Sequence, residues 1–127
     1  MTKTHIKEQE RLIKNLYQYE IYNSLDFHSF NLLNESNQAI LKELVKMKDQ
    51  IDSLISDNLF NYTIDRLNLV DLAIIRMAVY NLLKKELPKE VIFNLSIEIT
   101  KKLSDLDDEA QHKFTNRLLQ NISDNIK

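Results

Sequence analysis

The stretch VDLAIIRMAVYNLLKK, residues 70–85, is the most hydrophobic segment of the chain, yet it contains Asp71, Arg76 and Asn81. At about 100° per residue, these three polar side chains point in widely separated directions, so a helix here has no single polar face. A helix that is apolar on nearly all sides needs neighbours on nearly all sides. We therefore predict that residues 70–83 form a central helix against which the other helices pack.

The polar residues of this segment have separate expected roles. Asn68 can cap the start of the helix, and Asp71 three positions later places negative charge at the positive end of the helix dipole. Arg76 lies in the middle, where an unpaired guanidinium would be costly to bury. We predict that Glu98 is its partner and that the pair is structural rather than a ligand contact.

The composition predicts an all-α protein. The chain has 127 residues, enough for one domain with a core, and 43% of them are apolar and 28% charged. Glycine is absent and Pro88 is the only proline, so the residues that make tight hairpin turns are missing. Cysteine is also absent, which excludes disulfides, thiolate zinc sites and a cysteine nucleophile.

Charge and hydropathy bound the function more loosely. The net charge is −2, so any surface that attracts nucleic acid must be local. The first ten residues, MTKTHIKEQE, lack the apolar run of a secretory signal, and no stretch of 18 apolar residues occurs. These features predict a cytoplasmic protein.

Apolar spacing predicts a compact bundle of about six or seven helices in two packed subdomains. The helices expected beside the central one span about 4–23, 25–33, 37–58, 91–100 and 107–125. Residues 91–100 also alternate like a strand, but a lone strand would leave its backbone groups unsatisfied. The single domain 1–127 is expected to have an N-terminal lobe, about 1–58, and a C-terminal lobe, about 59–127.

The first predicted helix carries a basic stripe. Its members fall at i, i+4, i+8 and i+11, which places them on one side of a helix beside the apolar face: Lys3, Lys7, Arg11 and Lys14. Such a stripe can bind phosphates. It is equally compatible with an ordinary solvated surface, because Glu8 and Glu10 lie close by in the sequence.

Two further groups are candidates for RNA contact. Lys113 and Phe114 could meet a phosphate and stack on an unpaired base, although Phe114 also continues the core spacing of the last helix. Lys84 and Lys85 end the central helix, where cations favour the negative end of the dipole. They could extend a phosphate track if the last helix lies beside them.

No pattern in the sequence indicates an enzyme, a metal site or a cofactor. The three histidines, His5, His28 and His112, are not spaced as helical metal ligands. The acidic run DLDDEA, residues 105–110, has alanine where a calcium loop needs glycine. A chain without glycine also lacks the usual phosphate-binding loops.

Several motifs together resemble one bacterial family. They are LYQYE (16–20), YTIDRLNLVDLAIIRMAVYNLL (62–83), LPKEVIFNLSIEITKKLSD (87–105) and HKFTNRLL (112–119). In order and spacing they resemble the NusB family of transcription antitermination factors, over nearly the whole length.

The resemblance implies a helical, non-enzymatic protein of two subdomains. It implies binding of single-stranded boxA RNA together with NusE, a ribosomal protein of the small subunit, so that RNA polymerase reads through terminators in ribosomal RNA operons. It implies that Phe114 lies at the RNA site. Tyr17, Tyr19 and Tyr22 could contact the protein partner or form the seam between the first helix and its neighbours. Tyr17 matches the family's first helix and is the expected contact, together with Asn81. Residues 4–11 contain only two cations, Lys7 and Arg11, where the family usually has several arginines. A helical protein-interaction module with weak or lost RNA binding is therefore the alternative.

Overall fold

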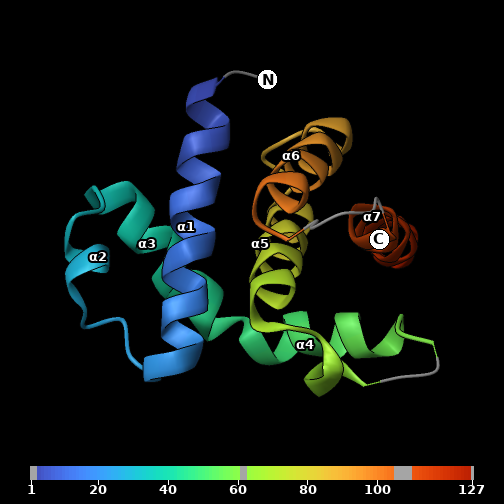
Figure 1. Cartoon of the computed structure of the whole chain (residues 1–127), viewed down its shortest axis with the longest axis horizontal. Helices are drawn as coiled ribbons and strands as arrows, with labels where there is room; N and C mark the ends of the chain where they lie inside the picture. Colours follow the sequence, from blue (N-terminus) through green and yellow to red (C-terminus); the bar gives the residue numbers. More distant parts are fainter. Residues whose placement is uncertain (1–2, 61–62, 105–109, 127) are drawn as a thin grey trace.

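The computed structural model describes residues 3–60, 63–104 and 110–126, with the side chains of Lys3 and Thr4 left aside. Over these residues the fold contains helices and no strand, which confirms the prediction of an all-α bundle. The helices are α1 Lys3–Tyr22, α2 His28–Asn31, α3 Glu35–Lys46, α4 Lys48–Asp57, the 3₁₀ turn η1 Ile64–Arg66, α5 Leu69–Lys84, α6 Lys89–Leu103 and α7 Ala110–Asn125. Figure 1 shows α2 and α3 on one side of α1 and α5, α6 and α7 on the other. The division into lobes near residue 58 stays a prediction.

The central helix is α5, as predicted. It contacts α1, α4, α6 and α7, and every side chain from Asp71 to Tyr80 is buried. Its start is capped as expected, because the side chain of Asn68 accepts a hydrogen bond of 2.8 Å from the backbone N–H of Asp71. The Asp71 carboxylate in turn accepts a hydrogen bond from the hydroxyl of Ser104, at the end of α6. The polar groups of this helix start are thus satisfied inside the fold.

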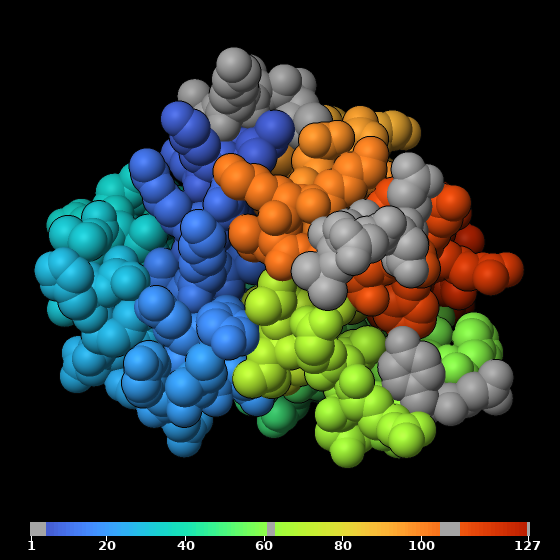
Figure 2. All heavy atoms as spheres, in the orientation of Figure 1, coloured from blue at the N-terminus to red at the C-terminus, as the bar shows by residue number. Residues whose placement is uncertain are grey.

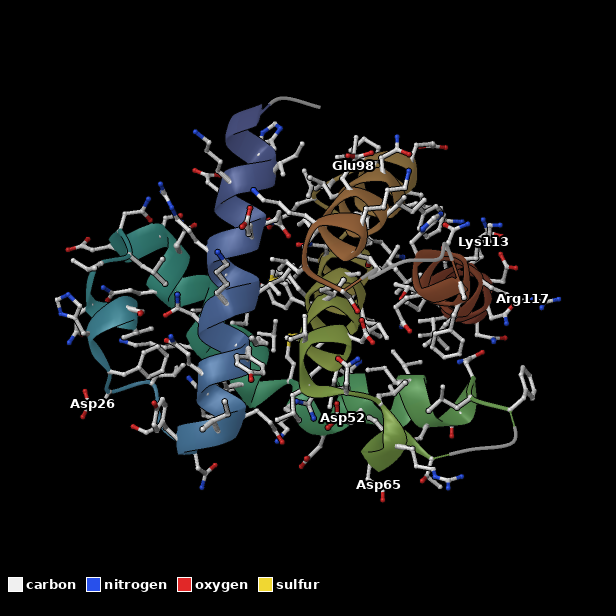
Figure 3. All side chains as sticks on the ribbon, viewed as in Figure 1. Asp26, Asp52, Asp65, Glu98, Lys113 and Arg117 are labelled. Carbon is white, nitrogen blue, oxygen red and sulfur yellow. The ribbon has the colours of Figure 1, made fainter. Side chains whose placement is uncertain are left out.

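The partner of Arg76 differs from the prediction. Its guanidinium donates two hydrogen bonds of 2.9 Å to the carboxylate of Asp52 in α4, and a third of 3.0 Å to Glu20 in α1. Glu98 is exposed on α6, and Figure 3 shows it at the opposite end of the molecule from Asp52. The prediction of Glu98 was wrong, because the outer face of α6 carries Glu98 away from α5. The prediction of a structural ion pair was right.

This ion pair joins three helices. Burial acts to lower the pKa of Arg76, but the hydrogen bonds and charges of Asp52 and Glu20 outweigh it and hold the pKa above its ordinary value. The guanidinium therefore stays charged and ties α1 and α4 to the central helix.

The long helix predicted over residues 37–58 is two helices. The backbone leaves α-helical geometry at Met47, with φ −92° and ψ 3°, between α3 and α4. The apolar spacing continues through this bend, since Leu44 and Ile51 are both buried. The bend lets α3 pack on α1 while α4 packs on α5 and α7. Periodicity alone does not reveal such a change of direction.

The ambiguous segment 91–100 is helical and forms most of α6. Its buried side chains at helical spacing include Ile92, Leu95 and Ile99, so the prediction of a helix is confirmed. The predicted last helix, about 107–125, is described from Ala110 onward as α7, and residues 105–109 lie outside the described part of the chain. None of the described helices has the length and apolar character needed to cross a membrane.

Candidate nucleic-acid interface

The predicted basic stripe lies on the outer side of α1. Lys7, Arg11 and Lys14 are all exposed there. Arg11 and Lys14 line a groove with the segment of α2 and the start of α3, and on the other side Lys14 shares Glu10 with Lys102 of α6. The fourth member, Lys3, is in the helix, but its side chain lies outside the described atoms.

A buried glutamate connects this stripe to a second helix. Glu10 is only 8% exposed, and its two carboxylate oxygens each meet an ammonium group. Lys14 lies 3.1 Å from one oxygen, and Lys102, in the last turn of α6, lies 2.9 Å from the other. Figure 2 shows the side chains of α1, in blue, and of the end of α6, in orange, in contact on the viewed face. The cations of α1 therefore continue onto α6.

Among the described side chains that meet at Glu10, the cations outnumber the carboxylate. One carboxylate faces two ammonium groups whose side chains are 59% exposed, and Lys101 beside them is also exposed. The hydrogen bond from Lys102, helped by that from Lys14, lowers the pKa of Glu10 below its ordinary value although burial opposes this. Glu10 therefore remains ionised and cancels only one of the two neighbouring charges.

The sequence alone did not predict that Lys102 belongs to the basic surface. The pair Lys101 and Lys102 is visible in the motif ending in KKLSD, but it has the appearance of an ordinary basic helix end. Only the packing of the end of α6 against the middle of α1 shows that Lys102 joins the stripe.

A second candidate surface surrounds Phe114 in α7. Phe114 is half-buried against the core, so its two expected roles are not exclusive. It lines a pocket of about 390 Å³ together with the strongly exposed ring of Phe60, which is 71% exposed, and with Arg117. Lys113 is exposed one residue earlier, and Figure 3 places Lys113 and Arg117 on the side of the molecule away from α2 and α3. Two aromatic rings and nearby cations suit an unpaired base.

Lys84 and Lys85 are separated from Lys113 by the length of α7. Lys85 lines a cavity with Ser123, in the last turn of α7, whereas Lys113 lies in its first turn. The last helix therefore does lie beside the end of α5. The part of α7 that lies there is its C-terminal end, and not the N-terminal end that carries Lys113. Lys84 is only half-exposed and lies 2.9 Å from Glu43 of α3.

Lys84 belongs to a small polar cluster between α3 and α5. The hydroxyl of Tyr80 donates a hydrogen bond of 2.6 Å to Glu43, and this bond and the one from Lys84 lower the pKa of Glu43. The same contact raises the pKa of Lys84. Lys84 therefore has a structural role, and Lys85, exposed with φ 57°, closes the end of α5.

The two residues expected at the protein partner lie on neighbouring helices. Tyr17 of α1 is half-buried and packs against the core. Asn81 of α5 is half-buried, and its side-chain amide donates a hydrogen bond of 3.0 Å to Gln9 of α1. Beyond Tyr17, the end of α1 exposes Ile21 and Tyr22, at 51% and 65%. This exposed apolar end is available for contact with another protein.

The described residues contain no group of three His, Asp or Glu side chains that could hold a metal ion. The assembled features are cations on helix surfaces and an aromatic pocket. Such an arrangement can bind a nucleic acid through phosphate and base contacts.

Comparison with known proteins identifies the family. The model of the NusB family matches residues 5–124. The chain belongs to the NusB family. The transcription antitermination protein NusB of Listeria innocua is 37% identical over 121 residues, covering 91% of this chain and 92% of the relative. That of Clostridium botulinum is 50% identical over 86 residues, covering 67% and 62%. These NusB relatives are named as antitermination proteins and not as enzymes, in agreement with the sequence prediction.

Solved NusB structures share the fold. T. maritima NusB superimposes with a TM-score of 0.83 at 27% identity, covering 98% of this chain and 93% of that one. A structure of antitermination factors NusB and NusE in complex with double-stranded RNA gives a TM-score of 0.82 at 23% identity, covering 99% and 100%. The second likeness, at this low identity, concerns the arrangement of the helices alone.

Proposed function

We propose that this protein binds single-stranded RNA of the boxA type together with ribosomal protein NusE. In this proposal the complex associates with RNA polymerase in the bacterial cytoplasm and supports read-through of ribosomal RNA operons. The protein itself has no catalytic part in the process and uses no cofactor. Membership of the NusB family and the names of the relatives support this assignment.

The observation that carries the proposal is the row of exposed cations on α1 that is joined to the end of α6. A chain with a net charge of −2 gathers Lys7, Arg11 and Lys14 on one exposed helix side and joins them to Lys102 through Glu10. Because RNA affinity depends on neutralised phosphates, a local surface of this kind can bind RNA despite the overall charge.

The pocket at α7 adds a place for bases. Phe60 offers an exposed ring and Phe114 a half-buried one, while Arg117 can hold a phosphate or stack on a base. The proposed RNA path runs from the stripe on α1, over the end of α6, to this pocket.

The proposed NusE contact uses the partly exposed α1–α5 surface. Tyr17 and Asn81 are its expected members, and the exposed end of α1 at Ile21 and Tyr22 adds apolar area. The solved complex of NusB with NusE and RNA, which has the same arrangement of helices, supports an assembly of this composition.

The salt dependence of RNA binding tests the proposal. With about four phosphates neutralised, the logarithm of the affinity for a boxA oligonucleotide should fall with the logarithm of salt at a slope of roughly −3. The double variant Lys7→Glu and Arg11→Glu should lose most of the affinity with NusE present and keep its thermal stability. The matched control, Lys46→Glu and Arg66→Glu, reverses two exposed cations elsewhere and should bind nearly as wild type.

The alternative function is a protein-interaction module with weak or lost RNA binding. It is favoured by the pairing of Lys14 and Lys102 with Glu10 and of Lys84 with Glu43, which neutralises part of the cationic charge. A flat salt response, or NusE binding without any boxA binding in a native gel, would select this alternative.

A further inference from the structure

Residues 24–38, which we call the lid, lie against one side of α1. The lid contains the connection after α1, the short helix α2 and the first turn of α3. Only three of its side chains are buried, those of Phe30, Leu33 and Asn37. A groove of about 580 Å³ lies between the lid and α1. The lid is therefore packed less completely than the central helix, whose side chains from Asp71 to Tyr80 are all buried.

The hydrogen bonds of the lid are internal. The amide nitrogen of Gln38 donates to the backbone carbonyl of Leu33 at 2.9 Å and to that of Phe30 at 3.4 Å, and Asn34 accepts a hydrogen bond of 2.8 Å from the N–H of Asn37. Among the described residues, no hydrogen bond or ion pair joins the lid to α1, whereas side-chain hydrogen bonds join α1 to both α5 and α6. A segment that is bonded to itself and not to its support can move as one unit.

The closed position of the lid leaves two buried acceptors without a donor. Asn15 and Gln18 of α1 line the groove beneath the lid. The amide nitrogen of Asn15 donates to the carbonyl of Arg11, which leaves its Oδ1 as an acceptor. Neither this atom nor Oε1 of Gln18 accepts a hydrogen bond from a described group, and each has less than 1 Å² of accessible surface, so water does not reach it. Opening of the lid would hydrate both oxygens and so offset part of the cost of exposing apolar side chains.

The two ends of the lid confine the movement to it. At one end, Asn23 stops α1 in the left-handed region, with φ 51°, which asparagine adopts more readily than most residues. At the other end, Leu41 and Leu44 of α3 are fully buried, and Glu43 accepts a hydrogen bond from Tyr80 of α5. These contacts hold the rest of α3 on the bundle.

We infer that the lid opens from α1 as a unit while the rest of the bundle stays folded. The lid forms one wall of the groove that Arg11 and Lys14 also line, and its Phe27 ring lies 6.4 Å from the ring of Tyr22, measured between centroids. Opening therefore changes the surface beside the basic stripe and beside the exposed end of α1. The inference concerns the free chain, so a failure of RNA or NusE binding would leave it intact.

Thiol labelling of the full chain tests the opening. The chain has no cysteine, so one introduced thiol is the only one present. Asn15→Cys places a thiol beneath the lid at a position that is 4% exposed. The matched control is Ser96→Cys, since Ser96 is 5% exposed but faces a small cavity lined by α1, α5 and α6. Asn15→Cys should be labelled at least roughly a hundredfold faster, because the control reacts only on global unfolding. Equal rates would overturn the inference.

A second substitution distinguishes opening of the lid from entry of the reagent through the groove. In the Asn15→Cys background, Gln18→Leu removes the remaining unsatisfied acceptor and so stabilises the closed lid. Labelling should slow by about tenfold, the effect of one buried acceptor without a donor. Gln50→Leu makes the same change on an exposed position of α4 and should leave the rate unchanged. A rate that Gln18→Leu does not alter would overturn the inference, and circular dichroism checks that each variant is folded.

Discussion

Two arginines on neighbouring helices show how position decides what a charge does. Arg76 of α5 is 7% exposed and donates to two carboxylates, so its charge is used within the fold. Arg11 of α1 is exposed beside a groove and belongs to a stripe of like charges. Like charges gathered on a surface contribute little to folding, and their field attracts an anionic partner. The inner face of the bundle thus uses charge within the fold, whereas the charges of the outer face are the ones proposed to bind RNA.

The strongest test of this comparison is to remove the inner charge. Arg76→Met should lower the free energy of unfolding by about 2–4 kcal/mol, because Asp52 and Glu20 would be left partly buried without a cation. The estimate is at the lower end for such pairs because both carboxylates are about one quarter exposed. Urea unfolding followed by circular dichroism measures the change.

The matched variant removes the outer charge. Arg11→Met should change the free energy of unfolding by no more than about 0.5 kcal/mol, since it replaces an exposed side chain. If both variants lower the free energy of unfolding equally, the two arginines have the same structural role, and the comparison fails.

The inner region was largely predictable because its signal is local. The lack of a polar face over residues 70–83 identified the central helix, and Asn68 with Asp71 marked its start. The partners of Arg76 were not predictable in this way. Asp52 is 24 positions earlier and Glu20 is 56 positions earlier, and periodicity contains no information on which distant carboxylate packs against a given helix.

The outer region was predictable only in part. Spacing placed Lys7, Arg11 and Lys14 on one side of α1, and the structure keeps them there. Lys102 joins them only through the crossing of α6 over α1. The groove beside Asn15 depends on how the segment with α2 folds back on α1, which short-range patterns do not specify.

The pocket at α7 gives a second and smaller contrast between inner and outer positions. Phe60→Ala changes a ring that is 71% exposed, so it should weaken RNA binding by about 1–2 kcal/mol, the worth of a stacked base, and leave stability unchanged. Phe114→Ala should reduce both, because Phe114 also packs against the core. Fluorescence anisotropy with a labelled oligonucleotide and thermal unfolding give the two readings. Equal loss of stability in both variants would show that Phe60 is part of the core.

Glu10 lies where the inner and outer regions meet, and its replacement should give a small but specific effect. Glu10→Gln removes the carboxylate that Lys14 and Lys102 share, so the free energy of unfolding at neutral pH should fall by about 0.5–1 kcal/mol. The value is small because both lysine side chains are 59% exposed. At the same time two cations lose their counter-charge, so RNA affinity at low salt should rise severalfold. Glu98→Gln, on an exposed position of α6, is the control and should do neither.

The pH dependence of the stability tests the role of Glu10 independently. The pKa of Glu10 is lower in the folded protein than its ordinary value, because Lys102 and Lys14 stabilise the ionised form. The stability that it contributes is therefore fully present above the ordinary glutamate pKa and is lost as the pH falls through the lowered, folded-state pKa. The difference in stability between wild type and Glu10→Gln should shrink over that acidic range. A residue that only holds helices together would lose stability and RNA affinity together when replaced. Opposite signs for the two, with the stability difference fading in acid, are expected only if Glu10 restrains a cationic surface that RNA uses.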